Sequence, residues 1–300
     1  MSAADPITGF REALTAAGLG APPEIIPDGK IHRFRADNEK SGSNAWYVFH
    51  QDPPAAGAFG NWRTGETGTW CARAGGTLDP DERRRLEAHI RQARQAQESD
   101  RRQRHEAAAR RALDIWQHAK PADQAHPYLL RKGIQPHGTR QTGAGLLLVP
   151  VTLDGRIISV QTINAAGDKL FLSGGRTAGG YYRLPDAPHH EPLLIGEGFA
   201  TVASLTEETS AAGIVAFNAG NLVAVAKAMR ERHPAAEIIV AGDNDRHTEG
   251  NPGATQAQAA ARAVGGKVLI PEFDPDEPGT DWNDWLLQRR APGAGGHHGE

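Results

Sequence analysis

The second half of the chain alternates short apolar runs with helix-forming segments, and this alternation constrains the fold more than any other feature. Four apolar runs span residues 193–195, 214–217, 238–241 and 268–270. Between them lie three segments of helical composition, 199–208, 221–232 and 253–264. Strands that alternate with helices predict an α/β fold with a doubly wound, mostly parallel sheet.

Acidic residues follow three of these runs. They are Glu197, Asp243, Asp245, Asp281 and Asp284. Because ligands bind outside the carboxyl ends of parallel strands, we expect these carboxylates to converge at one edge of the sheet. Clustered carboxylates repel one another, and oxygen-only ligands favour Mg²⁺ or Mn²⁺ as the neutralising ion. Taken singly, each acid also fits a turn or a helix start.

A smaller unit is expected upstream of this sheet. Residues 146–149, 157–163 and 169–172 have strand patterns, with hairpin turns at 154–155 and 166–168. Residues 126–134 indicate a short helix that ends at Gly133. The segment 113–188 is therefore predicted to form a small α+β subdomain, followed by the sheet domain over 189–290.

The ordered motifs of this region resemble a known family. GEGFATVASL, NAGN, AGDNDRHTEGNPGATQA and PGTDWNDW together resemble a TOPRIM domain. Upstream, HPYLLRKGI and DGRIISVQTINAAGDKLFLSGGRTAGGYYRL resemble the amino-terminal half of the polymerase core of bacterial-type DNA primases. The resemblance covers residues 113–290 and is closest to plasmid- and phage-encoded TOPRIM primases.

The resemblance implies roles for individual positions. Glu197 matches the TOPRIM glutamate, which is implied as general acid or base and as a neighbour of the metal. Asp243 and Asp245 match the metal-binding pair, and Asp281 and Asp284 lie where further acids are expected. Five basic or polar residues are expected to contact the nucleotide or the nucleic acid: Lys169, Arg131, Lys132, Arg176 and Asn221. Lys169 is also expected to be catalytic. For the arginines and Lys132, exposed solubilising charge is the alternative interpretation.

Residues 1–78 are predicted to form a β-rich domain, with a helix over 7–18 and strands at 31–34 and 45–50. These strands resemble the zinc ribbon that precedes the core in many such primases. The sequence has one cysteine, Cys71, so we expect no zinc. Trp62 and Arg63 suit base stacking and phosphate contact with single-stranded DNA. Packing in the core is the alternative for Trp62.

Residues 79–112 are rich in arginine and predict a long linker helix. Its charges fit either a solvated helix face or contact with a nucleic-acid backbone. Residues 291–300 are rich in glycine and are expected to form a disordered tail.

The composition limits the classes of function. Lys and Arg number 33 against 36 Asp and Glu, a net charge of −3, so nucleic acid would bind to a local basic patch. No apolar run approaches the ~20 residues of a membrane span, and the start lacks a signal peptide, which predicts a soluble cytoplasmic protein without a membrane partner. No phosphate-binding GxxxxGK[ST] motif is present.

The favoured hypothesis is a primase that uses NTPs and Mg²⁺ or Mn²⁺ to synthesise short RNA primers on single-stranded DNA. Plasmid or phage replication is the expected setting, with a separate replicative helicase or replication protein as partner. Two alternatives stay open at this point. One is a metal-dependent nuclease of the TOPRIM class, and the other is a non-catalytic DNA-binding or regulatory protein.

Overall fold

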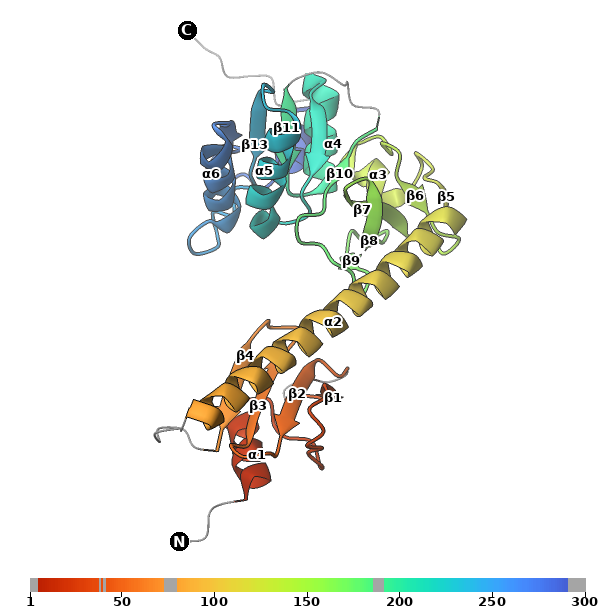
Figure 1. The fold of residues 1–300 in the computed structure, drawn as a ribbon. Helices are drawn as coiled ribbons and strands as arrows, with labels where there is room; N and C mark the ends of the chain where they lie inside the picture. Colours follow the sequence, from red (N-terminus) through yellow and green to blue (C-terminus); the bar gives the residue numbers. More distant parts are fainter. Residues whose placement is uncertain (1–4, 38, 40–41, 73–79, 186–191, 291–300) are drawn as a thin grey trace. The chain divides into compact units, whose positions relative to one another are not determined.

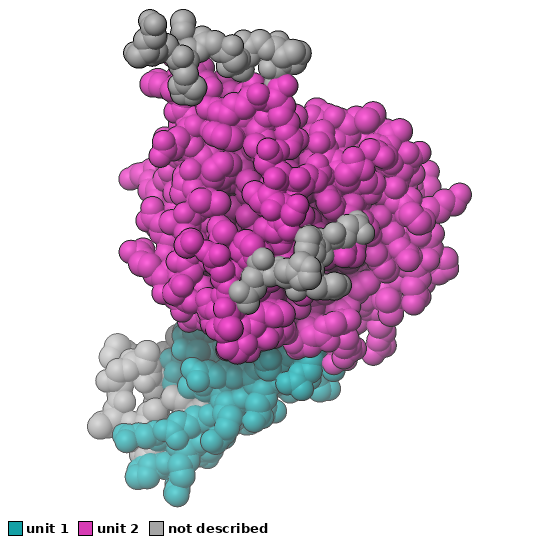
Figure 2. All heavy atoms as spheres, turned by 90° about the horizontal axis from the view of Figure 1, so that it is seen from above, with its two compact units in different colours: residues 1–103 teal, residues 104–300 magenta. Residues whose placement is uncertain are grey.

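The computed structural model describes residues 5–37, 39, 42–72, 80–185 and 192–290, and of residues 82 and 86 the backbone alone. The chain forms two compact units, residues 1–103 and 104–300 (Figure 2). The expected tail and the expected boundaries near residues 78 and 188 lie outside the described residues.

The first unit contains one antiparallel sheet and a short helix (Figure 1). Helix α1 (Pro6–Ala16) starts behind Asp5, whose carboxylate accepts a hydrogen bond from the N–H of Ile7. The four strands pair in chain order: β1 (His32–Phe34), β2 (Ala45–His50), β3 (Ala56–Asn61) and β4 (Thr67–Cys71). The helix and the two strands predicted in this segment are all present.

Alternation along β2 gives this sheet two apolar faces. Tyr47 and Phe49 belong to the cluster that packs on α1, where the rings of Phe10 and Phe49 stack with centroids 4.7 Å apart. Trp46 and Val48 belong to a separate cluster on the other face. That cluster includes Ala93 of helix α2 (Pro80–His118).

Helix α2 is 39 residues long and covers the predicted linker. It continues past residue 112 to His118, because no helix breaker occurs before Pro121. Most of its described side chains are exposed, as expected from its low apolar content. Within the described residues, no helix is long and apolar enough to cross a bilayer.

The second unit begins with an antiparallel sheet. Its strands lie in chain order: β5 (Lys120–Pro121), β6 (Arg140–Gln141), β7 (Leu147–Leu153), β8 (Arg156–Ile163) and β9 (Lys169–Phe171). The β7–β8 hairpin turns at Asp154 and Gly155, which both have positive φ, as a tight two-residue turn requires. Helix α3 (Pro127–Lys132) ends at Gly133 in the left-handed conformation, as predicted.

The other sheet of this unit has the predicted α/β form. Its order is β10 (Tyr182–Arg183), β12 (Ala212–Val215), β11 (Leu193–Gly196), β13 (Ile238–Ala241) and β14 (Lys267–Leu269). All pairs are parallel except β10 with β12. The helices are α4 (Phe199–Thr209), α5 (Leu222–Arg232), α6 (Pro252–Val264) and α7 (Trp282–Arg290), with a short 3₁₀ turn, η1 (Ala219–Asn221), before α5.

Strand β11 lies between β12 and β13. The chain therefore passes from β11 to β12 on one side and then crosses back to β13 on the other side. The carboxyl end of β11 is therefore the topological switch point, where open α/β sheets bind ligands. One apolar core joins both sheets of the unit, from Leu147 and Val149 on β7 to Ile195 on β11. This shared core fixes β9 relative to the switch point.

Candidate active site

Two carboxylates meet at the switch point. Glu197 follows β11 and Asp243 lies just beyond β13, and these strands pair in parallel with Gly196 opposite Ala241. Oε1 of Glu197 and Oδ1 of Asp243 are buried and have no hydrogen-bond partner among the described residues. A buried polar atom without a partner is costly, so these two oxygens indicate a ligand site.

The surroundings of Glu197 favour its protonated form. Burial and the charge of Asp245 raise the pKa of Glu197 to about 7. Its carboxylate accepts hydrogen bonds from the backbone N–H groups of Asp243 and Ala219, which act in the opposite direction, as does Lys169. These contacts tie Glu197 to the loops that follow both neighbouring strands.

Asp243 shows the same effect more strongly. Burial and then the charges of Glu197, Asp281 and Asp245 raise the pKa of Asp243 to about 8, while Lys169 lowers it. Four of the five predicted acids therefore act electrostatically on one another, as the strand order led us to expect.

The turn after β13 is held in place by the start of α6. Oδ2 of Asp245 accepts a hydrogen bond of 3.0 Å from the N–H of Gly253. A Cβ at Gly253 would lie 2.6 Å from the carbonyl oxygen of Asp243, so only glycine fits there. Asn251 caps α6 and donates a hydrogen bond of 2.8 Å to Oδ1 of Asn244. The sequence analysis did not predict roles for Asn244, Asn251 or Gly253.

Lys169 reaches the same site from the other sheet. A Cβ at Gly198 would lie 3.7 Å from Nζ of Lys169, so the ammonium group lies beside the loop that carries Glu197. Lys169 also lowers the pKa of Glu197 and of Asp243. Edge strand β9 therefore brings the predicted cation to the predicted acids.

Asp281 and Asp284 already have a cation. Nζ of Lys132 lies 3.0 Å from Oδ1 of Asp284 and 3.8 Å from Oδ2 of Asp281. Oδ1 of Asp281 accepts a hydrogen bond of 2.8 Å from the N–H of Asp284 and so caps α7. Buried Asn283 donates to the carbonyl of Lys132 and to Oγ of Ser204, which links α7 to α3 and α4. Asn283 was not among the expected residues.

Asn221 is buried, and its amide binds backbone groups. Its Nδ2 donates to the carbonyls of Gly180 at 2.7 Å and Ala216 at 2.9 Å. Its Oδ1 accepts from the N–H of Gly179 at 2.8 Å. Asn221 therefore fastens the loop before β10 to the end of β12, and its nucleotide contact stays a prediction.

The two expected arginines lie on loops and helices of the second unit. Arg131 donates to the carbonyl of Ala165 and lies over the Tyr128 ring. Arg176 is exposed and donates a hydrogen bond of 3.0 Å to the carbonyl of Ala178. Either guanidinium keeps further N–H donors, so contact with nucleic acid stays a prediction for both.

Arg246, which sequence reasoning missed, ties the turn after β13 to the loop before α7. Its guanidinium lies over the Phe273 ring, with 5.2 Å to the centroid. It donates to the carbonyls of Asp274 and Glu277, residues of the loop that leads to Asp281. The signal in the sequence was an arginine directly after the acidic pair.

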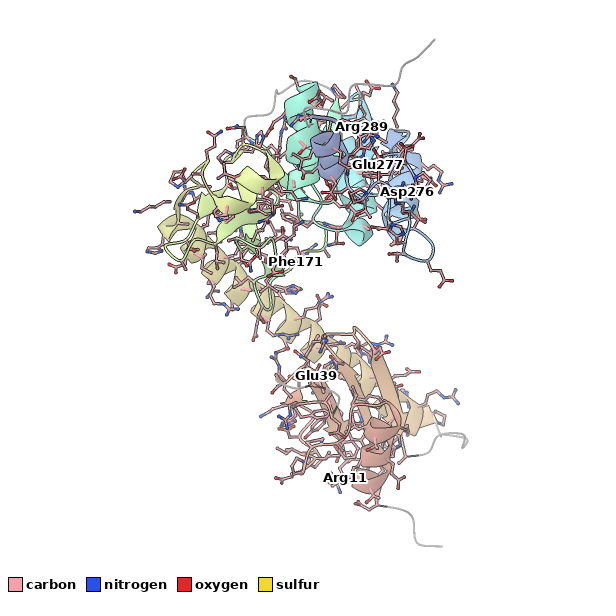
Figure 3. All side chains as sticks on the ribbon, turned by 180° about the vertical axis from the view of Figure 1, so that it is seen from behind. Arg11, Glu39, Phe171, Asp276, Glu277 and Arg289 are labelled. Atoms are coloured by element: carbon pink, nitrogen blue, oxygen red, sulfur yellow. The ribbon has the colours of Figure 1, made fainter. Side chains whose placement is uncertain are left out.

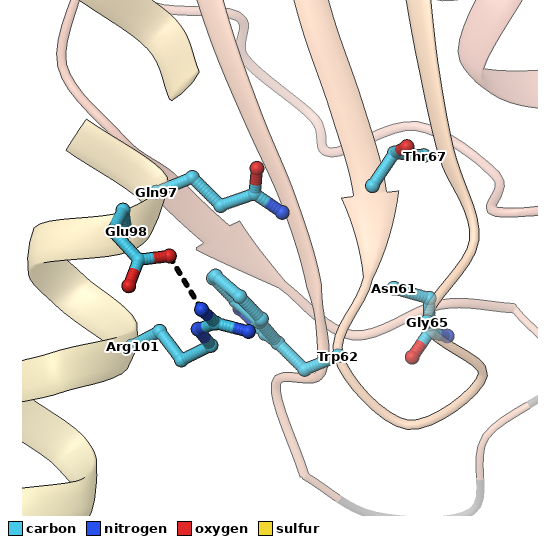
Figure 4. A pocket seen from close by; sticks show the side chains of 7 residues that line it. All are labelled: Asn61, Trp62, Gly65, Thr67, Gln97, Glu98 and Arg101. Carbon is cyan, nitrogen blue, oxygen red and sulfur yellow. Dashed lines mark hydrogen bonds and ion pairs between the residues drawn. The ribbon is translucent and has the colours of Figure 1, made fainter. Parts of the chain in front are cut away.

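Trp62 lies in the first unit, on the wall of a cavity of about 250 Å³ (Figure 4). The cavity is lined by Asn61, Trp62, Gly65, Thr67, Gln97, Glu98 and Arg101. The ring centroids of Trp62 and Trp46 are 5.6 Å apart, so Trp62 packs on the sheet. Trp62 also faces the cavity. Arg63 is exposed.

The donor set of the second unit fits Mg²⁺. No three His, Cys, Asp or Glu side chains in the described part of the chain are spaced to hold a metal ion by themselves. However, Mg²⁺ usually binds through one or two carboxylates, with waters and substrate phosphates completing its shell. Asp243, which has one unpartnered oxygen, and Asp245 in the same turn supply such a pair, with Glu197 beside them.

Comparison with known families agrees with this geometry. Residues 192–291 match the family model of the Toprim domain. This chain contains a Toprim domain. The expected fold and the resemblance to Toprim primases are therefore confirmed.

The Toprim chain is also similar to two curated proteins from Escherichia coli, both named DNA primase TraC. One is 38% identical over 285 residues, which is 89% of this chain and 26% of that protein. The other is 37% identical over 288 residues, which is 89% of this chain and 20% of that protein. The chain spans about a quarter or less of the length of these relatives.

Among solved structures, the zinc-binding and RNA polymerase domains of the Aquifex aeolicus primase align with 96% of this chain and 83% of that one. That alignment has 12% sequence identity and a TM-score of 0.41.

Proposed function

We propose that this chain carries the primer-synthesising part of a DNA primase, which joins NTPs into short RNA primers on single-stranded DNA. The observation that carries the proposal is the convergence of Glu197, Asp243 and Lys169 at the switch point of a Toprim sheet. Similarity to DNA primase TraC over 89% of the chain supports the choice of reaction.

In the proposed step, the 3′-hydroxyl oxygen of the primer attacks the α-phosphorus of an NTP. An oxygen–phosphorus bond forms, the bond from the α-phosphorus to the bridging oxygen breaks, and pyrophosphate leaves with the electron pair. Glu197, whose pKa of about 7 leaves part of it ionised at neutral pH, takes the hydroxyl proton in its ionised form. Bound Mg²⁺ would neutralise the phosphate charge.

Asp243 and Asp245 would hold that ion, because Gly253 fixes their turn and both carboxyl groups interact electrostatically with Glu197. Lys169 adds a positive charge beside the developing phosphate charge. Because Lys132 already pairs with Asp281 and Asp284, we assign these two acids to the support of the site rather than to direct metal contact.

The first unit is proposed to contact the template. Trp62 and Arg101 line one cavity, and an aromatic ring beside a guanidinium suits an unstacked base and its phosphate. A separate helicase or replication protein is the proposed source of unwinding.

The test is incubation of the chain with single-stranded DNA, labelled NTPs and Mg²⁺ or Mn²⁺, followed by a denaturing gel. We expect short, alkali-labile products that require the metal and the template. Cut template without such products would replace the proposal with the nuclease alternative. Bound but unchanged DNA, with no product at any metal concentration, would favour the non-catalytic alternative.

A further inference from the structure

Edge strand β9 presents a cation and an aromatic ring on the same face. Side chains two residues apart in a strand point the same way and are about 7 Å apart along it. Lys169 and Phe171 are such a pair, and Leu170 between them points to the opposite face. Within the described residues β9 pairs with β8 alone, so its other edge is open.

The Phe171 ring is held from one side. It meets the ring of Phe217 edge-on, with centroids 5.8 Å apart. Phe217 itself is buried, and its φ of 74° is a conformation that a bulky residue rarely adopts. Strained backbone of this kind persists where the surrounding structure enforces it and is found most often at functional sites.

The position of Phe217 connects this aromatic pair to the acids. Phe217 lies in the loop after β12, two residues before Ala219, whose N–H group contacts Glu197. Lys169, two residues before Phe171, lies beside Gly198 in the next loop. Phe171 nevertheless keeps 37% of its surface exposed (Figure 3). An exposed ring is therefore fixed at the border of the proposed active site.

We propose that Phe171 stacks on a nucleobase whose phosphate is held by Lys169. A nucleotide has a flat apolar base and an anionic phosphate at a separation that such a pair can span, and base–aromatic stacking tolerates every base. The inference rests on the proposed function, since the same acids and Lys169 would receive the triphosphate. The base belongs either to the incoming NTP or to the DNA strand.

The experiment measures equilibrium binding for this 300-residue chain and its variants in Mg²⁺. The probes are ATP, inorganic tripolyphosphate, which lacks a base, and a labelled single-stranded oligonucleotide. The variants are Phe171→Ala, Phe171→Trp, Lys169→Met and, as the matched control on the same strand, Leu170→Ala, whose residue is 70% exposed. Thermal unfolding of each variant verifies that the edge strand is intact.

We expect Phe171→Ala to weaken ATP binding about tenfold, a change within the range for loss of one base–aromatic stack. Tripolyphosphate binding should not change in this variant. Phe171→Trp should bind ATP with an affinity close to that of the wild type. Lys169→Met should weaken the binding of both ATP and tripolyphosphate. If Phe171→Ala weakens the binding of the oligonucleotide instead of the binding of ATP, the stacked base belongs to the DNA strand.

Equal affinities of Phe171→Ala and Leu170→Ala for ATP and for the oligonucleotide would overturn the inference. An equal loss of affinity for ATP and for tripolyphosphate in Phe171→Ala would also overturn it, because that pattern indicates distortion of the strand. These binding readouts do not need primer synthesis. A protein that makes no primers but shows the base-dependent loss would refute the proposed function and leave the stacking intact.

Discussion

At the scale of single residues, the site depends on the close approach of backbone groups at Gly253. A methyl group there would lie 2.6 Å from the Asp243 carbonyl oxygen and 2.9 Å from Oδ2 of Asp245. We expect Gly253→Ala to lower the free energy of unfolding by about 1–3 kcal/mol, as overpacking does, and to displace Asp245. Urea denaturation measures the change, and Gly143→Ala, with open space around its Cβ, is the control. Equal stability of both variants would show that the turn yields freely.

The carboxyl group of Glu207 is expected to make the stability of the folded protein depend on pH. Burial raises the pKa of Glu207, but hydrogen bonds from His137 and the Gln135 N–H outweigh it and hold this pKa below its ordinary value of 4.5. A carboxyl whose pKa is lowered by folding stabilises the folded state above its unfolded pKa and loses that contribution as the pH falls through its folded pKa. We therefore expect Glu207→Gln to cost about 1 kcal/mol at pH 7, since the group is half-buried.

The same comparison at a pH below the folded pKa of Glu207, which itself lies below 4.5, should give equal stabilities, because the wild-type carboxyl is then neutral. Denaturant titrations of both proteins at the two pH values measure this difference. A difference that persists unchanged at low pH would mean that shape rather than charge determines the contact.

At the scale of elements, the loop between β14 and α7 is positioned by Arg246. Its guanidinium binds two carbonyls and covers one ring of that loop. We expect Arg246→Lys to lose most of the bidentate contact, since an ammonium group cannot reproduce the planar fork. Primer synthesis should fall about tenfold through kcat, with less effect on KM, because one to two hydrogen bonds are lost away from the substrate. Arg262→Lys on the outer part of α6 is the control, and equal kinetics of both would contradict this role.

Strands and helices were largely predictable because they follow from local patterning. The apolar run at 238–241 became β13, and Gly133 ended α3, as the sequence indicated. The convergence of Glu197 with Asp243 was also foreseeable, because the carboxyl ends of parallel strands lie at one edge of the sheet. These inferences needed no knowledge of distant contacts.

The partners of the site residues were not predictable, because they come from distant parts of the chain. Lys132 pairs with Asp284, more than a hundred residues later, so one sequence cannot show that these charges neutralise each other. The amide of Asn221 binds four backbone groups, which its motif does not show, and its nucleotide contact stays a prediction. Long-range hydrogen bonds decide which polar residues have capacity for a ligand.

At the scale of the whole molecule, the proposed function divides the work between chemistry in the second unit and template contact in the first. Trp62→Ala should weaken binding of a single-stranded oligonucleotide about tenfold, from loss of one stacked base. Fluorescence anisotropy of a labelled oligonucleotide measures this, and Trp62→Phe should bind with intermediate affinity. Unchanged affinity would assign Trp62 to packing against Trp46 alone.

The most direct test of the central claim is primer synthesis by Asp243→Asn compared with Glu231→Gln. Asp243 carries an unpartnered buried carboxylate oxygen at the switch point, whereas Glu231 is an exposed carboxylate near the far end of α5. We predict that Asp243→Asn binds single-stranded DNA normally but makes at least about a hundredfold less primer, as expected when a catalytic metal ligand is lost, and that Glu231→Gln matches the wild type. Wild-type primer yields from a folded Asp243→Asn protein would contradict the assignment of the switch point as the catalytic centre.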